Sequence, residues 1–297
     1  MLIFKKLTID DKKLIDKYIK PYKFSISEYS FTTLLIWRKG CDIEYAIYNQ
    51  VLIIKKRDFR GNYHFMQPIG YKKEDLKEII EVLKEYKEEH GLKYLFKDVE
   101  DSFIEDIKEI YSDQLDMFED RDNFDYIYES EKLITLAGKK LHSKKNHYNF
   151  FIKTYEYVTK DINEEGVIAD CIRESRKWYE KNFKGDQYLL YELEGIEEVL
   201  INIGKLELKG MAVYIDGEVA AFTIGEAVNE DMAIIHIEKG DADKRGVYTF
   251  INKTFVEKYF YNVATINREQ DLGIEGLRKA KKSYHPIRLQ EKYLVNL

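Results

Sequence analysis

The sequence predicts a mixed α/β protein built as two α/β domains in tandem. The chain has 297 residues, about twice the size of a common single domain. Each half shows three strand-like segments in a row, then a helix, a strand, a helix and a strand, with corresponding segments about 165 residues apart. An antiparallel triplet followed by a strand-helix-strand unit gives a mixed sheet. No residue-level identity is visible between the halves, so the repeat is one of pattern.

In the first half, capping and turn residues set the ends of the expected elements. Thr8 and Asp11 have capping-box spacing before an apolar stripe, and Pro21 ends that helix. Gly91 ends a later helix whose apolar residues recur at helical spacing. The expected helices are 11–20, 27–37, 74–89 and 102–111, and the expected strands are 43–48, 51–57, 63–68, 94–97 and 125–128.

The second half repeats this order after an extra group of helices. Asp216-Gly217 is a strong signal for a two-residue hairpin turn between two strands. The expected helices are 131–151, one around 168–178, one around 193–203, 247–261 and 272–283, and the expected strands are 155–158, 210–215, 218–227, 232–238, 264–267 and 288–294. We therefore place the domains at residues 1–130 and 131–297.

Composition excludes several classes of protein. Two cysteines, Cys41 and Cys171, cannot form a disulfide framework, and the histidines lack metal-ligand spacing, so no metal is expected. A net charge of −6 argues against a protein coated in basic charge. No apolar run approaches the roughly 20 residues of a membrane helix, and no signal peptide is visible. We expect a cytoplasmic protein without integral membrane contact. P-loop, GxGxxG and GxSxG motifs are absent, which disfavours nucleotide hydrolysis, dinucleotide redox chemistry and esterase chemistry.

The loop 239–246, KGDADKRG, joins a predicted strand to a predicted helix. Backbone N–H groups at such a helix start attract phosphates, Gly246 allows close approach, and Lys244 and Arg245 add positive charge. Asp241 and Asp243 act against a phosphate. The loop is therefore either a phosphate cradle or a solvated turn.

The preceding strand offers a candidate base. Side chains alternate along a strand, so His236 and Glu238 are predicted on one face, pointing toward a cleft at the strand's end. Either group has the chemistry to take a proton from an attacking amine. The alternative is a hydrogen-bonded core histidine.

A basic cluster runs from Leu136 to Phe151. Lys140, Lys144 and His147 fall at helical spacing, and Lys139 and Asn146 share a neighbouring face. Such a stripe either binds phosphates or is a solvated helix face.

The segment 266–286 combines several polar signals. Asn267, Arg268 and Glu269 follow a predicted strand at its carboxyl end, where open α/β sheets bind ligands. Asp271 is placed as a helix N-cap. Arg278, Lys281 and Lys282, at spacings of three and four, predict one cationic helix face.

These segments also carry a resemblance. The order of elements resembles the N-acyltransferase (GNAT) fold, used twice. INREQDLGIEGLRKAKKSY (266–284), with GKKLHSKKNHYNFF (138–151) and SEYSFTTLLIW (27–37), resembles a bacterial family related to the C-terminal domain of phosphatidylglycerol lysyltransferases. The resemblance spans nearly the whole chain, and it implies a pair of GNAT-like domains related to enzymes that transfer amino acids.

The resemblance implies an aminoacyl-tRNA donor whose carbonyl is attacked by a hydroxyl or amine. The site residues that it implies are Lys139, Lys145, Asn146, Asn267, Arg268, Glu269, Asp271, Arg278, Lys281 and Tyr284. Glu269 is the preferred base, with His236 as the other candidate. The lysyltransferases carry a membrane-spanning region that this sequence lacks, so a small-molecule or peptide acceptor is expected rather than phosphatidylglycerol.

We therefore predict transfer of an aminoacyl or acyl group to an amine or hydroxyl acceptor, with tRNA as a partner. Two alternatives remain open. One is an N-acyltransferase that uses acyl-coenzyme A, with its phosphates bound at 239–246. The other is a catalytically degenerate ligand-binding protein of the same fold.

Overall fold

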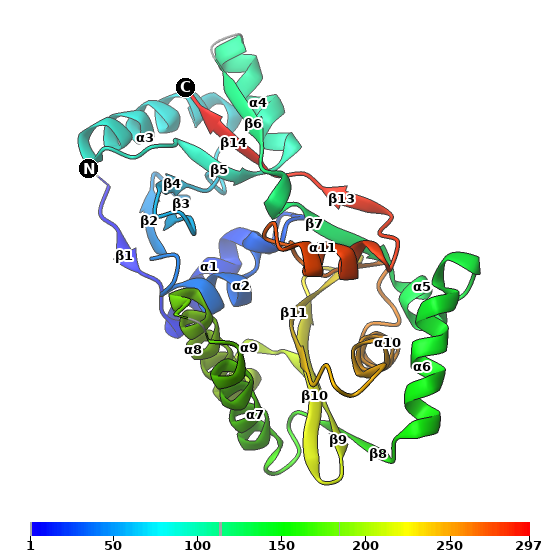
Figure 1. Ribbon diagram of the computed structural model, residues 1–297. Coiled ribbons are helices and arrows are strands. Elements are labelled where there is room, and N and C mark those ends of the chain that lie inside the picture. The colour runs from blue at the N-terminus through cyan, green and yellow to red at the C-terminus, as the bar shows by residue number, and fades with distance from the viewer. Residues whose placement is uncertain (1, 113–114, 184) are drawn as a thin grey trace. The chain divides into compact units, whose positions relative to one another are not determined.

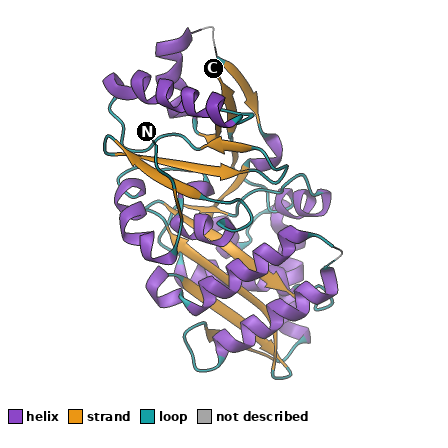
Figure 2. Cartoon of the chain, turned by 90° about the vertical axis from the view of Figure 1, so that its left-hand side faces the viewer, coloured by secondary structure: helices purple, strands orange, loops and turns teal. Residues whose placement is uncertain are grey.

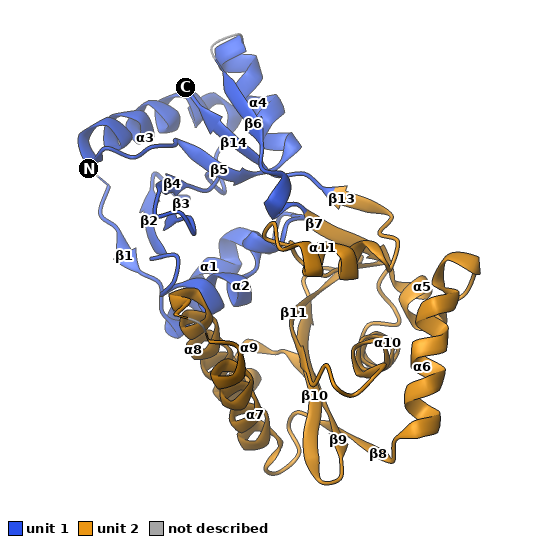
Figure 3. Cartoon of the chain, in the orientation of Figure 1, with its two compact units in different colours: residues 1–124, 290–297 blue, residues 125–289 orange. Residues whose placement is uncertain are grey.

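The structure is a computed structural model that describes residues 2–112, 115–183 and 185–297. The chain forms two compact units, residues 1–124 with 290–297 and residues 125–289 (Figure 3). These units do not coincide with the predicted domains 1–130 and 131–297. The reason is strand pairing: β7 (Asp125–Glu129) belongs to the sheet of unit 2, and β14 (Tyr293–Asn296) belongs to the sheet of unit 1.

Unit 1 contains a mixed sheet with the strand order β1-β2-β3-β4-β5-β14-β6 among the described residues. Its other strands are β1 (Lys5–Lys6), β2 (Glu44–Tyr48), β3 (Val51–Arg57), β4 (Tyr63–Phe65), β5 (Phe96–Val99) and β6 (Asp116–Glu119). β4 and β5 are parallel, through the pair Phe65 and Phe96, and the other neighbouring strands are antiparallel.

The helices of unit 1 are α1 (Lys12–Ile19), α2 (Phe31–Trp37), α3 (Leu76–His90) and α4 (Asp101–Tyr111), with short 3-10 turns at Ile9–Asp11, Ser27–Tyr29, Lys73–Asp75 and Arg121–Asn123. The apolar faces of α3 and α4 share a core with the sheet. Gly91 ends α3 in the left-handed conformation that the sequence predicts there.

Unit 2 contains a second mixed sheet with the order β13-β7-β12-β11-β10-β9-β8 among the described residues (Figure 1). Its remaining strands are β8 (Tyr157–Asp161), β9 (Lys209–Ile215), β10 (Glu218–Ala227), β11 (Met232–Gly240), β12 (Thr265–Asn267) and β13 (Arg288–Gln290). Asp216 and Gly217 both have positive φ, 54° and 82°, between β9 and β10, which confirms the predicted hairpin turn.

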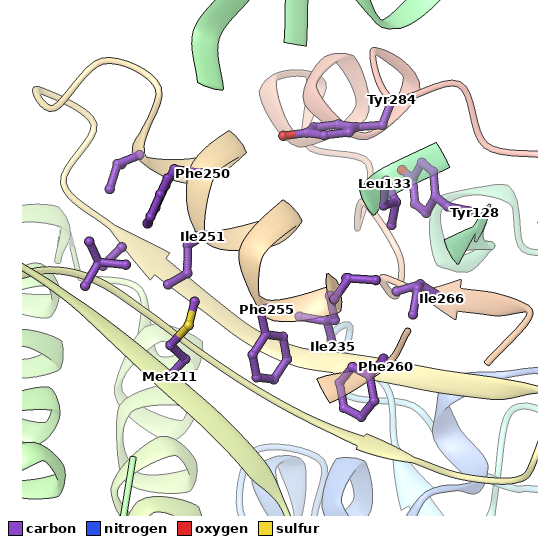
Figure 4. Close-up of a cluster of buried hydrophobic side chains, with 14 of the residues drawn as sticks. Tyr128, Leu133, Met211, Ile235, Phe250, Ile251, Phe255, Phe260, Ile266 and Tyr284 are labelled. Atoms are coloured by element: carbon purple, nitrogen blue, oxygen red, sulfur yellow. The ribbon is translucent and has the colours of Figure 1, made fainter. Parts of the chain in front are cut away.

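Helices cover both faces of this second sheet (Figures 1 and 2). They are α5 (Ser130–Thr135), α6 (His142–Thr154), α7 (Val167–Asn182), α8 (Gln187–Ile201), α9 (Ile203–Leu206), α10 (Val247–Tyr259) and α11 (Glu275–Lys282), and a 3-10 turn at Lys139–Leu141 precedes α6. Figure 4 shows α10 in the core, with Ile251 and Phe255 directed toward Met211 and Ile235 of the sheet. The ring of Phe250 stacks on that of Phe151 of α6.

Three predicted elements are wrong in extent. The predicted helix 27–37 is a 3-10 turn followed by α2, because Ser30 between them has an extended backbone and caps α2. The predicted helix 131–151 is two helices, because the chain turns at Leu136 (φ 49°) and Gly138 (φ 98°). The predicted strand 288–294 is two strands, β13 and β14, which lie in different sheets.

Candidate functional site

Two parallel strands diverge at the centre of unit 2. β11 pairs with β12 only from Met232–Ile234 to Thr265–Asn267. β11 then continues to Gly240 beside β10 alone. The segment after β12 turns away from β11 beyond Asn267, and Glu269 in that segment has a φ of 57°. Polar side chains from both segments fill the region of divergence, at the carboxyl ends of the strands as predicted.

A β-bulge separates His236 from Glu238. Ile224 lies opposite Ile237 and Gly225 opposite Ile235, so His236 is an extra residue on β11. The bulge reverses the alternation, and the prediction that His236 and Glu238 share a face is therefore wrong. Glu238 accepts a hydrogen bond from Asn252 of α10, whereas His236 contacts two other carboxylates.

His236 is clamped between two glutamates. Its Nδ1 lies 3.0 Å from Glu269 Oε1, its Nε2 lies 3.0 Å from Glu226 Oε1, and its side chain is fully buried. Burial lowers its pKa, but the two carboxylates together outweigh burial and raise the pKa to about 9. A histidine with protons on both nitrogens cannot accept another, and the Glu269 carboxylate is engaged with it. His236 therefore does not fit the role of the predicted base, and Glu269 binds it through the Oε1 atom of its carboxylate.

Arg268 and Glu238 form a second bridge across the divergence. Arg268 Nη2 lies 2.8 Å from Glu238 Oε1, and both side chains are 12% exposed. The guanidinium carbon lies 4.7 Å from the ring centre of Tyr284 and 5.7 Å from that of Tyr128. A stacked, ion-paired arginine is held in one orientation.

Three buried polar atoms around this ion pair have no hydrogen-bond partner among the described residues. They are Arg268 Nη1, Asn252 Oδ1 and Thr223 Oγ1. Asn252 also donates to Glu238 at 3.0 Å, and Thr223 lies directly opposite Glu238 in the strand register. Because an unmade hydrogen bond in the interior costs about 1–3 kcal/mol, such a cluster calls for a functional explanation.

Thr223 and Asn252 are not among the predicted site residues. The available signal was a polar residue inside an apolar stretch: Thr223 interrupts VAAFTIG, and Asn252 lies on the inward face of an apolar helix. Such polar interruptions are common, so only the structure shows that the two converge on Glu238.

Two lysines next to the cluster have lowered pKa values. Burial, and then the positive charge of Arg268, lowers the pKa of Lys281 to about 8, and the same two causes lower that of Lys144 to about 8. Lys281 donates to the Arg268 carbonyl, and Lys144 Nζ lies 4.0 Å from the ring centre of Tyr284. The side chain of Lys144 makes no hydrogen bond or ion pair within the described parts of the chain.

Three other predicted site residues hold the structure together. Arg278 forms two hydrogen bonds with Asp271, at 2.9 and 2.8 Å, and Tyr126 donates to the same carboxylate at 2.6 Å. These contacts lower the pKa of Asp271 to about 2, against the effect of burial. Asn267 donates to Asp125 at 2.8 Å.

The α11 predictions need correction. The residue that precedes α11 is Ile274 and not Asp271, whose carboxylate binds Arg278 and the Gly273 N–H instead. The predicted cationic face is also divided. Arg278 is neutralised by Asp271, Lys281 is turned inward, and Lys282 is exposed.

The predicted phosphate loop lies against α6. A Cβ atom on Gly246 would lie 2.3 Å from the His147 carbonyl oxygen, so the close approach made at this glycine is that of a helix backbone. Arg245 lies over the ring of Phe150 at 4.4 Å and Lys244 over that of Tyr155 at 5.7 Å.

The structure separates the lysines of α6. Lys144 faces Tyr284 and the buried cluster. Lys139 and Lys145 are exposed and line a hollow with Leu136, Gly138 and His142, and Asn146 is exposed. These predicted site residues are not brought together with Arg268.

The described residues contain no group of three or more His, Cys, Asp or Glu side chains arranged to hold a metal ion. Within the same residues, none of the helices combines the length and the apolar character required to cross a lipid bilayer.

The sequence matches the family described as phosphatidylglycerol lysyltransferase, C-terminal, over residues 19–296. The chain belongs to this family. A curated relative from Mycoplasmoides gallisepticum, an uncharacterised protein, is 31% identical over 175 residues, or 58% of this chain. The match spans 56% of that protein, so this chain corresponds to about half of its length.

Several solved structures share the fold of this chain. A conserved protein of unknown function from Bacteroides thetaiotaomicron is 32% identical, with a TM-score of 0.89 over 99% of both chains. The C-terminal domain of a candidate lysylphosphatidylglycerol synthetase from Agrobacterium fabrum is 14% identical, with a TM-score of 0.66 over 96% of this chain and 91% of that one. A tandem GNAT protein from the clavulanic acid biosynthesis pathway is 8% identical, with a TM-score of 0.51 over 99% and 97%. The predicted tandem GNAT-like fold is confirmed.

Proposed function

We propose that unit 2 transfers an aminoacyl group from an aminoacyl-tRNA to an amine or hydroxyl acceptor. The observation that carries this proposal is the set of unpaired atoms around Glu238. The Glu238 carboxylate, Asn252 Oδ1 and Thr223 Oγ1 are acceptors suited to an ammonium group, and Arg268 Nη1 is a donor suited to a carbonyl oxygen. An α-aminoacyl ester carries both groups side by side, whereas a plain acyl thioester lacks the ammonium.

The chemistry requires a base and a stabiliser of negative charge. The acceptor's nitrogen or oxygen forms a bond to the ester carbon, and the carbonyl oxygen becomes negatively charged beside Arg268. Lys144 takes the acceptor's proton, because a pKa of about 8 leaves part of its amine neutral near neutral pH. The ester C–O bond then breaks, and the ribose oxygen of the tRNA leaves with that proton.

The experiment follows radiolabel from tRNA charged with a mixture of amino acids. Lysyl-tRNA and phosphatidylglycerol are the first pair to test, because the Agrobacterium structure is described as the C-terminal domain of a candidate lysylphosphatidylglycerol synthetase. Peptide and small-molecule extracts follow as acceptors. The expected result is movement of label to one acceptor class, faster than the spontaneous hydrolysis of the ester.

Two variants test the assignment of residues. We expect Arg268→Gln to lower kcat/KM about 100- to 1,000-fold, the usual effect of removing an oxyanion donor. Thr223→Val removes a hydroxyl that has no partner in the described residues, so it should keep or raise stability and still lower kcat/KM about tenfold or more. Arg176→Gln, which breaks an exposed pair with Glu197, is the matched control and should leave the rate unchanged.

Other outcomes would select the alternatives. Turnover of acyl-coenzyme A without turnover of charged tRNA would favour the N-acyltransferase. Binding of charged tRNA with no transfer to any acceptor would favour a non-catalytic binder.

A further inference from the structure

Strand β6 lies at an edge of the sheet of unit 1. It pairs with β14 on one side, and no strand lies on its other side among the residues that the structure describes. The Asp120 N–H, one position beyond this ladder, donates to the Lys292 carbonyl. Because positions that bond to the neighbouring strand alternate with positions that do not, Met117 and Glu119 direct their N–H and C=O groups away from β14. The outer side of β6 therefore presents two donors and two acceptors to a further strand.

Both faces of β6 are open to solvent. Its four residues are all exposed, and Met117 and Phe118 are 37% and 61% exposed. Neighbouring side chains on a strand point to opposite faces, so one apolar side chain lies on each face. Met117 lies opposite Val295 and Phe118 opposite Leu294 in the register with β14. A strand added at this edge would bury apolar surface on both faces, where each aromatic or branched cross-strand pair contributes about 0.2–1 kcal/mol.

The other edges of the two sheets, as far as the structure describes them, carry basic side chains. These are Lys5 and Lys6 of β1, Lys160 of β8 and Arg288 of β13. Charged residues, lysine above all, keep the edges of native sheets from pairing with other chains. β6 has no basic residue, and its charges are the carboxylates of Asp116 and Glu119. Its edge is therefore open to a strand of the opposite charge.

The charge around β6 selects the partner. Residues 113–122 contain five acidic residues and one basic residue, Arg121. Asp120 forms an ion pair with Lys97 at 2.9 Å, whereas Asp116 and Glu119 form none with any residue that the structure describes. A second copy of this chain would place the same acidic segment against this one, and like charges on facing strands are destabilising. A basic strand instead neutralises both carboxylates.

We propose that β6 binds an extended, basic segment of another protein as an additional strand of the sheet of unit 1. The N–H and C=O groups of Met117 and Glu119 hold the backbone of that segment, and its side chains alternate between the two faces. Basic side chains of the segment lie opposite Asp116 and Glu119, and apolar ones lie opposite Met117 and Phe118. This binding does not depend on the reaction proposed for unit 2.

The test titrates the full chain with a blocked synthetic peptide, TKKVVKT, at low salt. When this peptide pairs antiparallel with β6, its lysines lie opposite Asp116, Glu119 and Asp120, and its valines lie opposite Met117 and Phe118. We expect saturable shifts of the amide resonances of β6 and slower hydrogen exchange at the amides of Met117 and Glu119, because these two groups become bonded. The control peptide TEEVVET should not bind.

A charge reversal on the protein tests the choice of partner. Asp116→Lys/Glu119→Lys changes two exposed residues, so we expect the fold to be kept. This variant should bind TKKVVKT about tenfold or more weakly than the parent and should bind TEEVVET instead, because cross-strand attraction becomes repulsion. Glu85→Lys/Glu88→Lys makes the same change of charge at exposed positions of α3 and should keep the affinity for TKKVVKT within about twofold of the parent.

Four results would overturn the proposal. The first three are no binding of either peptide up to millimolar concentration, equal binding of both peptides by the parent, and equal losses in the two double variants. The fourth is a concentration-dependent dimer of the parent in which the amides of Met117 and Glu119 are already protected, since this would assign the edge to a second copy of the chain.

Discussion

His236 shows how neighbours decide the role of an ionisable side chain in unit 2. Its residue type suits a general base, but Glu226 and Glu269 hold both ring nitrogens and raise its pKa to about 9. The charged imidazolium ties the chain after β12 to β10 and β11. This bridge positions Arg268, the residue next to Glu269, against Glu238.

The raised pKa of His236 predicts a pH-dependent stability. Folding raises this pKa from 6.5 to about 9, so the folded protein holds the proton more tightly. The stabilisation is complete below pH 6.5 and is lost as the pH rises through about 9. At about 1.4 kcal/mol per pKa unit, we expect His236→Gln to lower the free energy of unfolding by about 3 kcal/mol at pH 6 and by much less above pH 9.5.

Urea unfolding measured at several pH values tests this expectation. Trp37 and Trp178 are the two tryptophans of the chain, so in a Trp37→Phe background the fluorescence of Trp178 reports unit 2. His142→Gln, at an exposed position of the same unit, is the control. The same loss of unfolding free energy in both variants, or a loss that does not depend on pH, would show that the contacts of His236 with Glu226 and Glu269 do not stabilise unit 2.

At the scale of elements, the bulge in β11 sets which residues meet. It turns Glu238 toward α10 and brings the β11 backbone close to β10 at Gly225. A Cβ atom there would lie 2.4 Å from the Ile234 carbonyl oxygen and 3.2 Å from the ring of Phe260. Only glycine fits without a shift of one strand.

We expect Gly225→Ala to destabilise unit 2 by about 1–3 kcal/mol, because the added methyl group overpacks the bulge. The midpoint of urea unfolding, again followed by Trp178, measures the effect. Gly204→Ala is the matched control, since a Cβ at Gly204 would meet no heavy atom within 4 Å and alanine favours its helix, α9. If the two variants unfold at the same midpoint, the bulge does not require glycine.

The same elements show what the sequence predicts and what it does not. Apolar periodicity and turn residues predict the tandem mixed sheets, the hairpin at Asp216-Gly217 and the polar segment after β12. Periodicity does not reveal a single inserted residue, so it places His236 and Glu238 on one face. It also does not reveal a break at Leu136, whose left-handed backbone nothing in its residue type favours. Both errors affect the site. The sequence pattern does not reveal either feature, because each depends on contacts with residues that are distant in sequence.

At the scale of the whole chain, the two units repeat chemistry as well as topology. The parallel pairs Phe65–Phe96 and Ile234–Asn267 are each followed, two residues on, by an acidic residue with a φ of 57°. Asp98 accepts from Lys56 at 2.6 Å, and Glu269 binds His236 at 3.0 Å. Each of these acidic residues thus pairs with a basic side chain from another strand of its own sheet, Lys56 of β3 and His236 of β11, although the halves show no residue-level identity.

The units differ in how the chain completes them. Unit 2 is one continuous segment, residues 125–289, and its sheet includes β7 between β12 and β13. Unit 1 obtains β14, the strand between β5 and β6, from the last residues of the chain. Removal of residues 290–297 therefore takes an interior strand from the sheet of unit 1, together with the buried ion pair between Lys292 and Glu28.

This asymmetry predicts which fragments fold. We expect residues 125–289 to fold alone, with dispersed amide resonances and a cooperative thermal transition. Residues 131–297 should not, because they lack β7 and with it the hydrogen bonds from Tyr126 to Asp271 and from Tyr128 to the Lys281 carbonyl. Residues 1–124 should likewise need residues 290–297 in order to fold. Fusion of residues 290–297 after residue 124, through a short glycine-serine linker, should restore folding, because β6 and β14 are antiparallel neighbours. A folded 131–297 fragment, or an unfolded 125–289 fragment, would show that the compact units are not the folding units.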